Sequence, residues 1–395
     1  MTRGHALLLQ RRYRMKKVAI LLTTSPHNGG EYTYAVSLME ALCEKNDIEF
    51  SLLAICCNRH WAKWCKQNQI EYVFTYRENY TADELKFMKK SWIFNRLYSR
   101  WKSELRKIIV SRKIDLLLVN QQLIPIPNLP CKVITPVHDL MHRYEAQFSE
   151  LRGQVEYRDL IFNDIALNSN IILVDSNLGA KQFKECYPRS VKGVKFEVLP
   201  FVVTDELEQC EEEYIDTPKR YVFYPAQFWE HKNHIRLIQA IEILKKRGLD
   251  VKLVLSGSKK NYYANVVQYI KEHGLEEDVD IKGFVTTGEL KYLYSHALAL
   301  VMPTFFGPTN IPPLEAMKLG CPPIVSGKYA MGEQVGDAGL TFDPTNPEDM
   351  ANCIEKVCDP LVRNDLVQKG YQRQKEWTSL DFKEKIVNIV LRELR

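Results

Sequence analysis

Short apolar runs alternate with longer amphipathic segments along the chain, and this pattern occurs as two separate series. The runs of the first series are rich in Val, Ile and Leu and lie at 18–22, 50–55, 72–74, 114–119, 133–135 and 171–174. Those of the second series lie at 221–224, 251–255, 279–281, 298–301 and 323–325. Strands that alternate with helices form parallel sheets with right-handed crossovers. The sequence therefore predicts an α/β fold with two Rossmann-like halves.

A polar, acidic stretch with little periodicity, residues 204–218, separates the two series. Such a composition is typical of a solvated connection between domains. The chain of 395 residues also exceeds the length at which a single hydrophobic core usually keeps growing. We therefore expect a first domain over residues 15–203 and a second over residues 219–374, with residues 1–14 as a tail that precedes the fold.

The cysteines and the apolar segments indicate the cellular compartment in which we expect the protein. The ten cysteines occur singly or as the pair Cys56-Cys57, and the apolar patch at 6–9 is shorter than the core of a signal peptide. No run approaches the roughly 20 apolar residues of a membrane-spanning helix. We expect reduced thiols and a cytoplasmic location. His138 and His142 have a metal-like spacing but lack the glutamate of a zinc protease motif, so we predict no metal site.

The positive charge is concentrated in the first part of the chain. The formal net charge is +5, but residues 1–113 carry 21 Lys and Arg against 10 Asp and Glu. Within this part, residues 86–107 interleave eight basic residues with five aromatic ones. A basic amphipathic helix of this kind suits an anionic membrane surface, and it is equally typical of a surface helix whose aromatic side chains enter the core. No helix-turn-helix, zinc-finger or RRM motif supports binding to nucleic acid.

The stretch from Gly307 to Gly320 combines a glycine-containing loop with the start of a predicted helix, directly after the apolar run 297–302. A strand that ends in such a loop and then opens a helix presents backbone N–H groups to an anion. Glu315, one turn into the helix, can accept hydrogen bonds from ribose hydroxyls. The alternative is an ordinary first-turn acid favoured by the helix dipole. The pattern indicates a site for a nucleotide diphosphate.

The block Pro312–Pro322 resembles the nucleotide-sugar motif of the retaining GT-B glycosyltransferases of family four. Residues 221–234 are similar to that family's strand and phosphate-binding loop, and residues 281–294 to its base-contacting turn. The three motifs follow the family's order and spacing, and the resemblance extends over nearly the whole chain. It implies two Rossmann-like domains that face each other across a cleft, with the last helix, within residues 375–395, crossing back onto the first domain.

The resemblance also implies roles for individual residues. Lys232 matches the family's diphosphate-binding lysine, Glu315 its ribose-binding acid, and His138 the active-site histidine that contacts the transferred sugar. The loop with Gly29 and Gly30 would face the diphosphate from the first domain. The base-contacting turn contributes Gly283, Phe284 and Val285.

Each of these positions has a plainer interpretation. Lys232 could be a solvated lysine at a helix start, His138 a packed side chain beside a helix-capping Asp139, and the Gly29-Gly30 pair an ordinary turn. Ser176 and Asn177 follow the run at 171–174 and are interpreted as a helix cap.

Two positions depart from the family's pattern. The family commonly has an arginine on the phosphate-binding loop, a few residues before the position of Lys232. This sequence has Gln227 there, so one positive charge is missing from the loop. Gly307 occupies the position of the first acid of the family's paired-glutamate motif. The donor sugar would then be held by the backbone N–H groups of Thr309, Asn310 and Ile311, with the Asn310 side chain as a further candidate. The Gly-Pro-Thr-Asn segment resembles a bacterial surface-polysaccharide subgroup.

The function implied is a retaining, metal-independent hexosyltransferase that needs no cofactor. It would move a sugar from GDP-mannose, or second from a UDP-hexose, to a glycan or lipid-linked acceptor in lipopolysaccharide or capsule biosynthesis, at the inner face of the plasma membrane. A nucleotide-sugar epimerase and a catalytically silent nucleotide-sugar-binding homologue are the alternatives.

Overall fold

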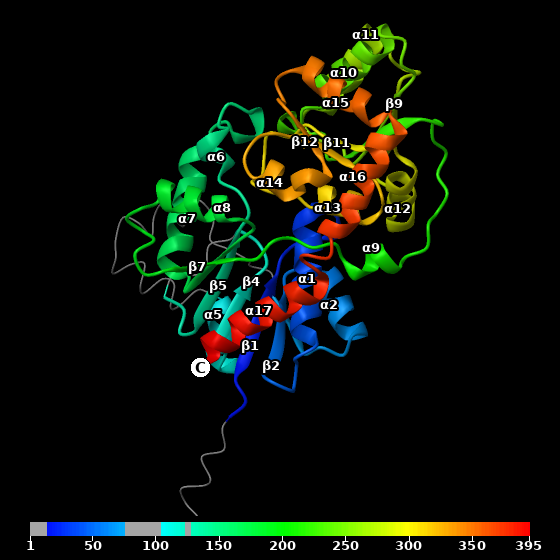
Figure 1. Ribbon diagram of the computed structural model, residues 1–395. Coiled ribbons are helices and arrows are strands. Elements are labelled where there is room, and N and C mark those ends of the chain that lie inside the picture. The colour runs from blue at the N-terminus through cyan, green and yellow to red at the C-terminus, as the bar shows by residue number, and fades with distance from the viewer. Residues whose placement is uncertain (1–13, 76–103, 123–127) are drawn as a thin grey trace, which may run out of the picture.

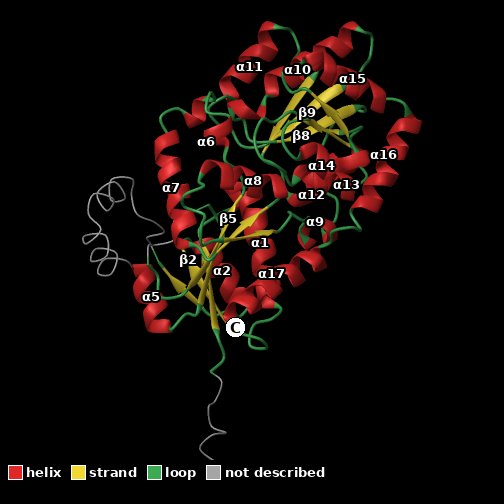
Figure 2. Ribbon diagram, turned by 60° about the vertical axis from the view of Figure 1, so that its left-hand side comes forward, coloured by secondary structure: helices red, strands yellow, loops and turns green. Residues whose placement is uncertain are grey.

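The computed structural model describes residues 14–75, 104–122 and 128–395, which form two α/β domains (Figure 1). Each domain is built on one parallel sheet, with helices on both faces of the strands (Figure 2). The expected α/β architecture with two Rossmann-like halves is therefore confirmed.

The first sheet has seven strands in the order β3-β2-β1-β4-β5-β6-β7, and every pairing is parallel. The order reverses direction between β1 and β4, which is the topological switch point of a doubly wound sheet. The strands are β1 (Lys17–Leu22), β2 (Ser51–Cys56), β3 (Tyr72–Phe74), β4 (Leu116–Val119), β5 (Lys132–Val137), β6 (Ile171–Val174) and β7 (Lys195–Val198).

The helices of the first domain lie on the two faces of this sheet. Those whose side chains join one hydrophobic core are α1 (Gly30–Cys43) and α2 (Arg59–Gln67), together with the C-terminal helix α17 (Ser379–Leu394). The opposite face is covered by α5 (Glu104–Arg112), α7 (Val155–Asn168) and α8 (Asn177–Cys186). Two short helical segments, α6 (Met141–Tyr144) and η2 (Ser149–Leu151), follow β5, and η1 (Pro26–Asn28) follows β1.

The second sheet has six parallel strands in the order β10-β9-β8-β11-β12-β13, again with a switch point beside its first strand. The strands are β8 (Tyr221–Pro225), β9 (Lys252–Ser256), β10 (Val279–Gly283), β11 (Leu300–Met302), β12 (Pro323–Ser326) and β13 (Leu340–Phe342). The helical elements are η3 (Glu230–Lys232), α10 (His234–Lys246), α11 (Tyr263–Glu272), α12 (Thr287–His296), α13 (Pro312–Lys318), α14 (Met331–Val335), η4 (Gly336–Ala338), α15 (Pro347–Val357) and α16 (Pro360–Arg373).

All eleven predicted apolar runs contain a strand, whereas the edge strands β7 and β13 were not predicted. The missed strands have a physical reason in common. β7 has the sequence Lys-Phe-Glu-Val and β13 has only three residues, so neither is a continuous apolar run. Each lies at the end of its sheet, where one side of the strand is not covered by another strand. Edge strands need less hydrophobic sequence because they are less buried.

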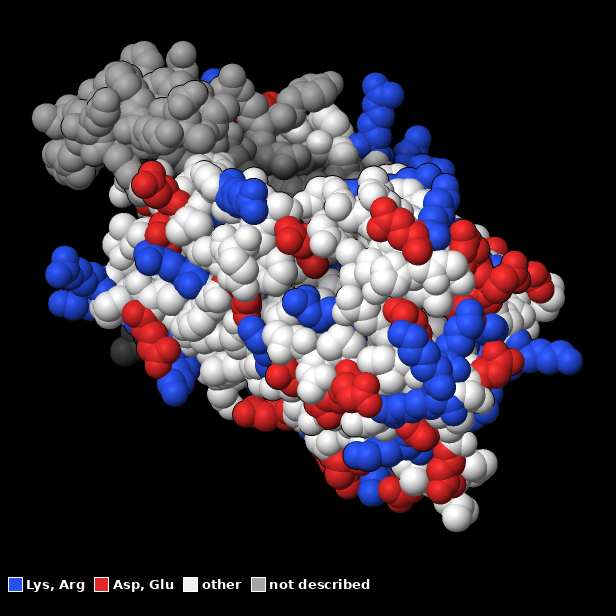
Figure 3. All heavy atoms as spheres, turned by 90° about the horizontal axis from the view of Figure 1, so that it is seen from above, with Lys and Arg blue, Asp and Glu red and all other residues white. Residues whose placement is uncertain are grey.

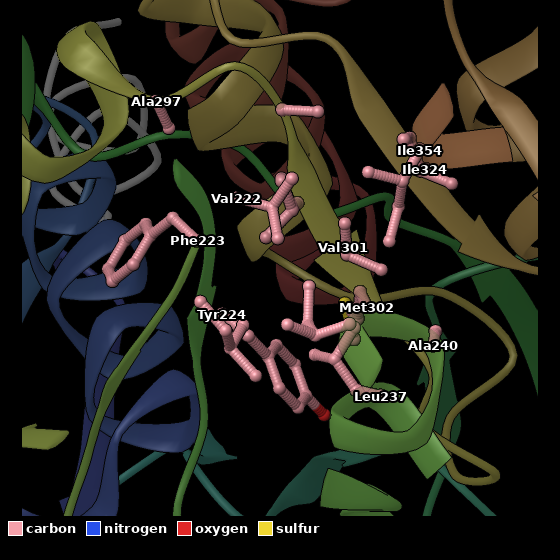
Figure 4. Packing of buried hydrophobic residues seen from close by; sticks show 14 of the residues in the cluster. Val222, Phe223, Tyr224, Leu237, Ala240, Ala297, Val301, Met302, Ile324 and Ile354 are labelled. Carbon is pink, nitrogen blue, oxygen red and sulfur yellow. The ribbon is translucent and has the colours of Figure 1, made fainter. Parts of the chain in front are cut away.

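The hydrophobic core of the second domain packs strand side chains against the flanking helices. Figure 4 shows Val301 and Ile324 of neighbouring strands beside Ile354 of α15. Tyr224 lies near Leu237 of α10, a helix that packs against α15. These side chains are at most 1% exposed or fully buried, which makes the sheet a rigid support for the loops that leave its carboxyl ends.

The C-terminal helix α17 packs onto the first domain. It lies against α1, and its apolar side chains belong to the core beneath the first sheet (Figure 1). A capping box of Thr378 and Asp381 fixes the start of this helix. The buried side chains of this helix's apolar face are Phe382, Ile386, Val387, Ile389 and Val390.

The connection at 204–218 is more structured than expected. It begins with a short helix, α9 (Asp205–Gln209), which contacts α12 of the second domain. Leu207 in this helix is only 2% exposed, because its side chain is covered where the two domains meet. The neighbouring Glu206, Glu208 and Gln209 are exposed, so within α9 Leu207 is the buried side chain in a segment that is otherwise open to solvent.

In the view of Figure 3, Lys and Arg side chains are interspersed with Asp and Glu over the described surface. Residues 1–13 and 76–103, outside the described part, hold ten of the 21 basic residues counted in the first 113. The proposed basic aromatic segment falls mostly in this part, and only residues 104–107 belong to α5. Within the described residues, no helix is long and apolar enough to cross a membrane.

Candidate active site

A cavity of about 390 Å³ lies between the domains, at the carboxyl ends of strands from both sheets. This is where doubly wound folds bind ligands, because the loops that follow the strands converge there. Its first-domain wall includes Gly29, Gly30, Glu31, Gln122, His138 and Asp139. The second domain contributes Gln227, Trp229, Lys232, Phe306, Thr309, Asn310 and Ile311.

A second cavity of about 430 Å³ adjoins the first. Gly29 of the first domain and Pro225, Ala226 and Gln227 of the second line both cavities, so these residues form the boundary between the two spaces. The second cavity also contains Glu315, Gly257 and the turn with Phe284 and Val285. The predicted phosphate-binding and base-contacting motifs thus lie in adjoining cavities.

Lys232 lies in the first cavity, at the end of η3 and directly before α10. Asn233, in the left-handed conformation with φ of 64°, makes the turn into α10. Burial lowers the pKa of the Lys232 ammonium to about 8, against the opposing effect of Asp139 and Glu150. Lys232 is half-buried and lines the cavity, so its side chain is placed to contact a ligand there.

His138 follows β5 and lines the same cavity. Its ring lies edge-on to Tyr34, with 4.7 Å between ring centroids, and 5.3 Å from Phe201. Burial lowers the pKa of His138 to about 4, so the imidazole is neutral near pH 7. Nε2 of His138 is buried and finds no hydrogen-bond partner among the described residues. A neutral imidazole with an unused nitrogen at a cavity wall can bind a ligand hydroxyl.

Asp139, beside His138, accepts a hydrogen bond from the Met141 N–H at 3.1 Å. Burial opposes its ionisation, but Arg158, 3.4 Å away, helps to hold the pKa of Asp139 below its ordinary value. Asp139 therefore lies in the cavity wall and accepts a hydrogen bond at the start of α6, whose N-cap residue is Leu140. Ser176 caps α8 as expected, accepting a hydrogen bond from the Gly179 N–H at 3.1 Å.

Glu315 sits in the first turn of α13 and faces the second cavity. Its Oε2 accepts a hydrogen bond of 2.7 Å from the Tyr294 hydroxyl. Burial raises the pKa of Glu315 to about 7, and the hydrogen bond from Tyr294 only partly offsets this. A first-turn acid that served the helix dipole alone would not need a buried hydroxyl partner.

Gly257 in the second cavity is explained by a close backbone contact, whereas Gly283, which the resemblance assigned to the donor site, lines neither cavity. Gly257 has φ of +141°, and a Cβ there would lie 2.3 Å from the carbonyl oxygen of Ala226. Its N–H donates to the carbonyl of Gly283, which has φ of +76°, at 2.6 Å. Sequence reasoning missed Gly257, although the Ser256-Gly257-Ser258 turn directly after a predicted strand was a usable signal.

The loop after β11 differs from the expectation in its hydrogen bonds. The N–H of Thr309 donates to Asp175 Oδ2 at 3.1 Å, and the N–H of Asn310 donates to Gln334 Oε1 at 3.0 Å. The expectation that these two N–H groups hold the donor sugar is therefore wrong, because protein side chains already use them. Thr309, Asn310 and Ile311 still line the cavity, so their side chains remain candidates for sugar contacts.

Gly307 could not be replaced by an acid without moving this loop. Its φ is +88°, and a Cβ would lie 2.9 Å from the Thr309 carbonyl oxygen and 3.0 Å from the Asn310 side chain. A side chain at position 307 is therefore incompatible with the observed backbone path.

Gln227 uses both ends of its side chain. Its Oε1 accepts a 2.8 Å hydrogen bond from the Trp229 indole, and its Nε2 donates at 3.0 Å to the backbone carbonyl of His27 in the first domain. The residue therefore bridges the domains at the boundary between the two cavities.

Glu31 is a further cavity residue that sequence reasoning missed. Its Oε2 accepts a hydrogen bond of 2.7 Å from Gln121, and its Oε1 makes no hydrogen bond with the described residues. Burial raises its pKa, with Gln121 opposing and the nearby Asp139 adding to the shift. The signal was its position directly after the glycine pair.

The described residues contain no group of three or more His, Cys, Asp or Glu side chains that could hold a metal ion. His142, the other half of the metal-like pair, is buried and hydrogen-bonds through Nε2 to the Tyr187 hydroxyl at 2.8 Å and to Asp159 at 3.1 Å. Nδ1 of His142 is also buried and finds no hydrogen-bond partner among the described residues, so this side chain is packed in the core and does not line either cavity.

Part of the chain is similar to known glycosyltransferases. Residues 205–373 match the family model described as glycosyl transferases group 1. The O-antigen chain mannosyltransferase B of Escherichia coli is 30% identical over 161 residues, 40% of this chain and 42% of that relative, so the match spans less than half of the relative. The O-antigen chain mannosyltransferase RfbU of Salmonella typhimurium is 24% identical over 330 residues, 83% of this chain and 87% of that protein.

Solved structures share the fold at low sequence identity. A glycosyltransferase from Rickettsia africae superposes with a TM-score of 0.70 at 14% identity, covering 97% of this chain and all of that one. A sucrose-phosphate synthase from Thermosynechococcus elongatus gives 0.72 at 16% identity, covering 95% of this chain and 98% of that one. Anabaena HepE in complex with UDP gives 0.68 at 15% identity, covering 95% and 99%.

The fold and its neighbours define a GT-B α/β protein. The family match lies within residues 205–373, so this part of the chain is similar to the group 1 glycosyltransferases. The same matches give no support to the epimerase alternative.

Proposed function

We propose that this protein transfers a sugar, in the first instance mannose, from a nucleotide diphosphate sugar to a hydroxyl of a glycan or lipid-linked acceptor, with retention of anomeric configuration. The observation that carries the proposal is the pair of adjoining cavities, with Lys232 in one and Glu315 in the other. A nucleotide sugar needs two such spaces, one for the nucleoside and one for the sugar, with the diphosphate at their boundary.

The nucleoside would occupy the second cavity. Glu315 would accept hydrogen bonds from the ribose hydroxyls, and the exposed ring of Phe284, 5.9 Å from that of His27, would contact the base. The backbone comes close to this space at Gly257, where a side chain has no room.

The diphosphate would lie at the boundary, near Gly29 and Lys232. Cleavage of the sugar–phosphate bond leaves negative charge on the diphosphate, and an ammonium in a largely water-excluded site stabilises that charge more than it would in water. Neutral His138 would bind a sugar hydroxyl through its unused nitrogen. These contacts need no metal ion or other cofactor, so we propose that the reaction uses none.

The acceptor would approach from the first-domain wall. Glu31 has a carboxylate oxygen available for an incoming hydroxyl, and Asp139 adds a second carboxylate to the same wall. A wall with two carboxylates favours an uncharged hydroxyl-bearing sugar over a phosphorylated group at the attacking end of the acceptor.

Mannose as the transferred sugar is supported by the names of the relatives, two of which are O-antigen mannosyltransferases. GDP-mannose is the donor we propose first. UDP-hexoses come second, since the Anabaena neighbour is solved in complex with UDP. Retention is supported by the resemblance of residues 312–322 to the retaining family.

We further propose that the protein works at the cytoplasmic face of the plasma membrane, where lipid-linked acceptors are built. The support is the sequence of residues 86–107, whose eight basic and five aromatic residues suit an anionic lipid surface.

Thermal unfolding in the presence of GDP, UDP, ADP and dTDP identifies the nucleotide, because a ligand at 100 times its Kd adds about 2.7 kcal/mol to stability. The matching sugar nucleotide is then incubated with and without mannosyl glycosides. Sugar released to water or transferred supports an active enzyme, and the proton coupling of the product's anomeric carbon tests retention. Nucleotide binding without release of sugar or nucleotide would identify a silent homologue.

A further inference from the structure

The loop that has lost the family's acid is held by a carboxylate of the other domain. Asp175 stands directly after β6 in the first domain, and Thr309 stands in the loop between β11 and α13 of the second. Asp175 Oδ2 accepts two hydrogen bonds from this one residue, from the N–H at 3.1 Å and from the hydroxyl at 2.5 Å.

The burial and the hydrogen bonds of Asp175 favour this contact. Its side chain is buried, with the residue 4% exposed, and its Oδ1 accepts a hydrogen bond from Ser176 at 3.2 Å. Asp175 has no basic partner among the described residues, and burial raises its pKa to about 7, because a buried carboxylate is costly to ionise. The Thr309 donors that offset part of this cost belong to the other domain, so they are available only when the domains are together.

The opposite end of the loop is braced within its own domain. Gln334 of α14 accepts from the Asn310 N–H at 3.0 Å and donates to the Asn310 carbonyl at 2.6 Å. The next residue, Ile311, is 7% exposed and joins the first-domain core, where its Cδ1 lies 3.5 Å from the position of a Cβ on Gly30. The loop is thus fixed from both domains.

Thr309 has one side toward Asp175 and the other toward the site. It lines the first cavity with Lys232 and His138, and it also lines a separate cavity of about 290 Å³ near Trp377, which Asp175 lines as well. Asp175 therefore does not face the space proposed for the sugar and acts on it only through Thr309.

We infer that Asp175 is a positioning residue, which holds the Gly307–Ile311 loop in its sugar-facing conformation through Thr309 when the two domains are together. The inference rests on the proposed function, since it assigns this loop to the transferred sugar. The predicted consequence is that loss of the contact affects the chemical step and spares nucleotide binding, because neither residue lines the second cavity.

The test uses Thr309→Val, which removes the hydroxyl donor while keeping the size, and Thr309→Ser, which keeps the hydroxyl. Asp175→Ala and the double variant Asp175→Ala/Thr309→Val complete a cycle. The matched control is Ser176→Ala, which loses a hydrogen bond to the same carboxylate from within the first domain and the cap of α8. For each full-length variant, kcat, donor KM, nucleoside diphosphate Kd and melting temperature are measured.

We expect Thr309→Val to lower kcat roughly tenfold to a hundredfold, the range for a hydrogen bond to a charged group. Nucleoside diphosphate Kd should stay within about twofold, Thr309→Ser should recover most of the activity, and the double variant should be no worse than Asp175→Ala. Ser176→Ala should lower the melting temperature and leave kcat near wild type.

An unchanged kcat in Thr309→Val would overturn the inference, as would equal losses in kcat and nucleotide affinity, or losses that simply add in the double variant. Failure of the proposed function itself looks different, because the wild-type protein would then show neither transfer nor donor hydrolysis. If Asp175→Ala does not fold, the comparison of kcat between Thr309→Val and Thr309→Ser still tests whether the Thr309 hydroxyl is needed.

Discussion

The Gln227 side chain donates a hydrogen bond of 3.0 Å to the backbone carbonyl of His27. This contact joins the loop after β8 to the segment after β1 across the interdomain cleft, at the boundary between the two cavities. An arginine there would bring a charge to the diphosphate, whereas the glutamine is a neutral link between domains. Lys232 is therefore the principal cation from the described residues in the first cavity.

Lys232→Ala should weaken nucleoside diphosphate binding roughly tenfold to a hundredfold and leave nucleoside binding almost unchanged, because the ammonium addresses phosphate. Isothermal titration with both ligands measures this, with Lys246→Ala, an exposed lysine of α10, as the control. An equal loss for both ligands would show that Lys232 is structural.

The affinity of the wild-type protein for the diphosphate should also depend on pH. The Lys232 pKa is lowered to about 8, so the ammonium is charged below that value and loses its proton above it. Bound phosphate favours the charged form of Lys232, so the loss of affinity occurs at a higher pH than the pKa of the free protein. We expect affinity to decline between about pH 8 and 10 in the wild type and to be nearly flat over that range in Lys232→Ala.

Glu315→Gln should raise the donor KM roughly tenfold to a hundredfold, since the amide loses the charge that strengthens hydrogen bonds from ribose. The raised pKa of Glu315, about 7, means that burial favours the neutral form, so its contribution to stability is present below its unfolded pKa and is lost as pH rises through 7. At pH 8 the variant should therefore melt at or above the wild-type temperature.

The matched control for this variant is Glu348→Gln, an exposed acid in the first turn of α15. It should leave the donor KM alone. If Glu315→Gln instead lowers the melting temperature and spares KM, Glu315 serves only the helix dipole and the proposed nucleotide site is wrong.

Glu31→Gln should lower kcat/KM for the acceptor about tenfold while donor hydrolysis and nucleotide affinity stay near wild type, because the lost charge faces the acceptor hydroxyl. Initial rates with varied mannosyl glycoside check the first point and hydrolysis without acceptor checks the second. Parallel losses of transfer and hydrolysis would mean that Glu31 acts on the whole cavity wall through Gln121.

Gly257→Ala should destabilise the second domain by about 2–4 kcal/mol, because the new methyl group meets the Ala226 carbonyl and the backbone is at positive φ. Nucleotide binding should weaken as well, since the displaced backbone borders the second cavity. Gly193→Ala is the control, because a Cβ there meets nothing within 4 Å. Similar melting temperatures for the two variants would contradict the close packing at Gly257.

Residues 86–107 should bind anionic vesicles, with each Lys or Arg near the surface contributing about 1 kcal/mol and added salt weakening the attraction. Co-sedimentation with phosphatidylserine-containing and neutral vesicles at low and high salt measures this. Binding that depends on neither lipid charge nor salt concentration would contradict the proposed interaction with an anionic membrane surface.

The sequence by itself determined the architecture and much of the candidate site. Continuous apolar runs located eleven strands, because a parallel strand buried on both faces must be apolar along its length. Lys232, Glu315 and His138 were predicted from the resemblance of their segments to family motifs, and their positions agree with it, since His138 follows β5 and Glu315 stands in the first turn of α13. Only β7 and β13 escaped, since edge strands do not need that composition.

The tertiary structure alone decided which backbone groups are available and which contacts cross the cleft. Asp175 and Thr309 are far apart in the sequence, as are Gln227 and His27, and no periodicity or spacing relates them. The N–H groups of Thr309 and Asn310 could be assigned to a sugar from the loop sequence, but side chains from distant elements already accept them. Local sequence fixes where a loop lies on its own sheet, whereas the partners of its polar groups depend on how two separately folded sheets face each other.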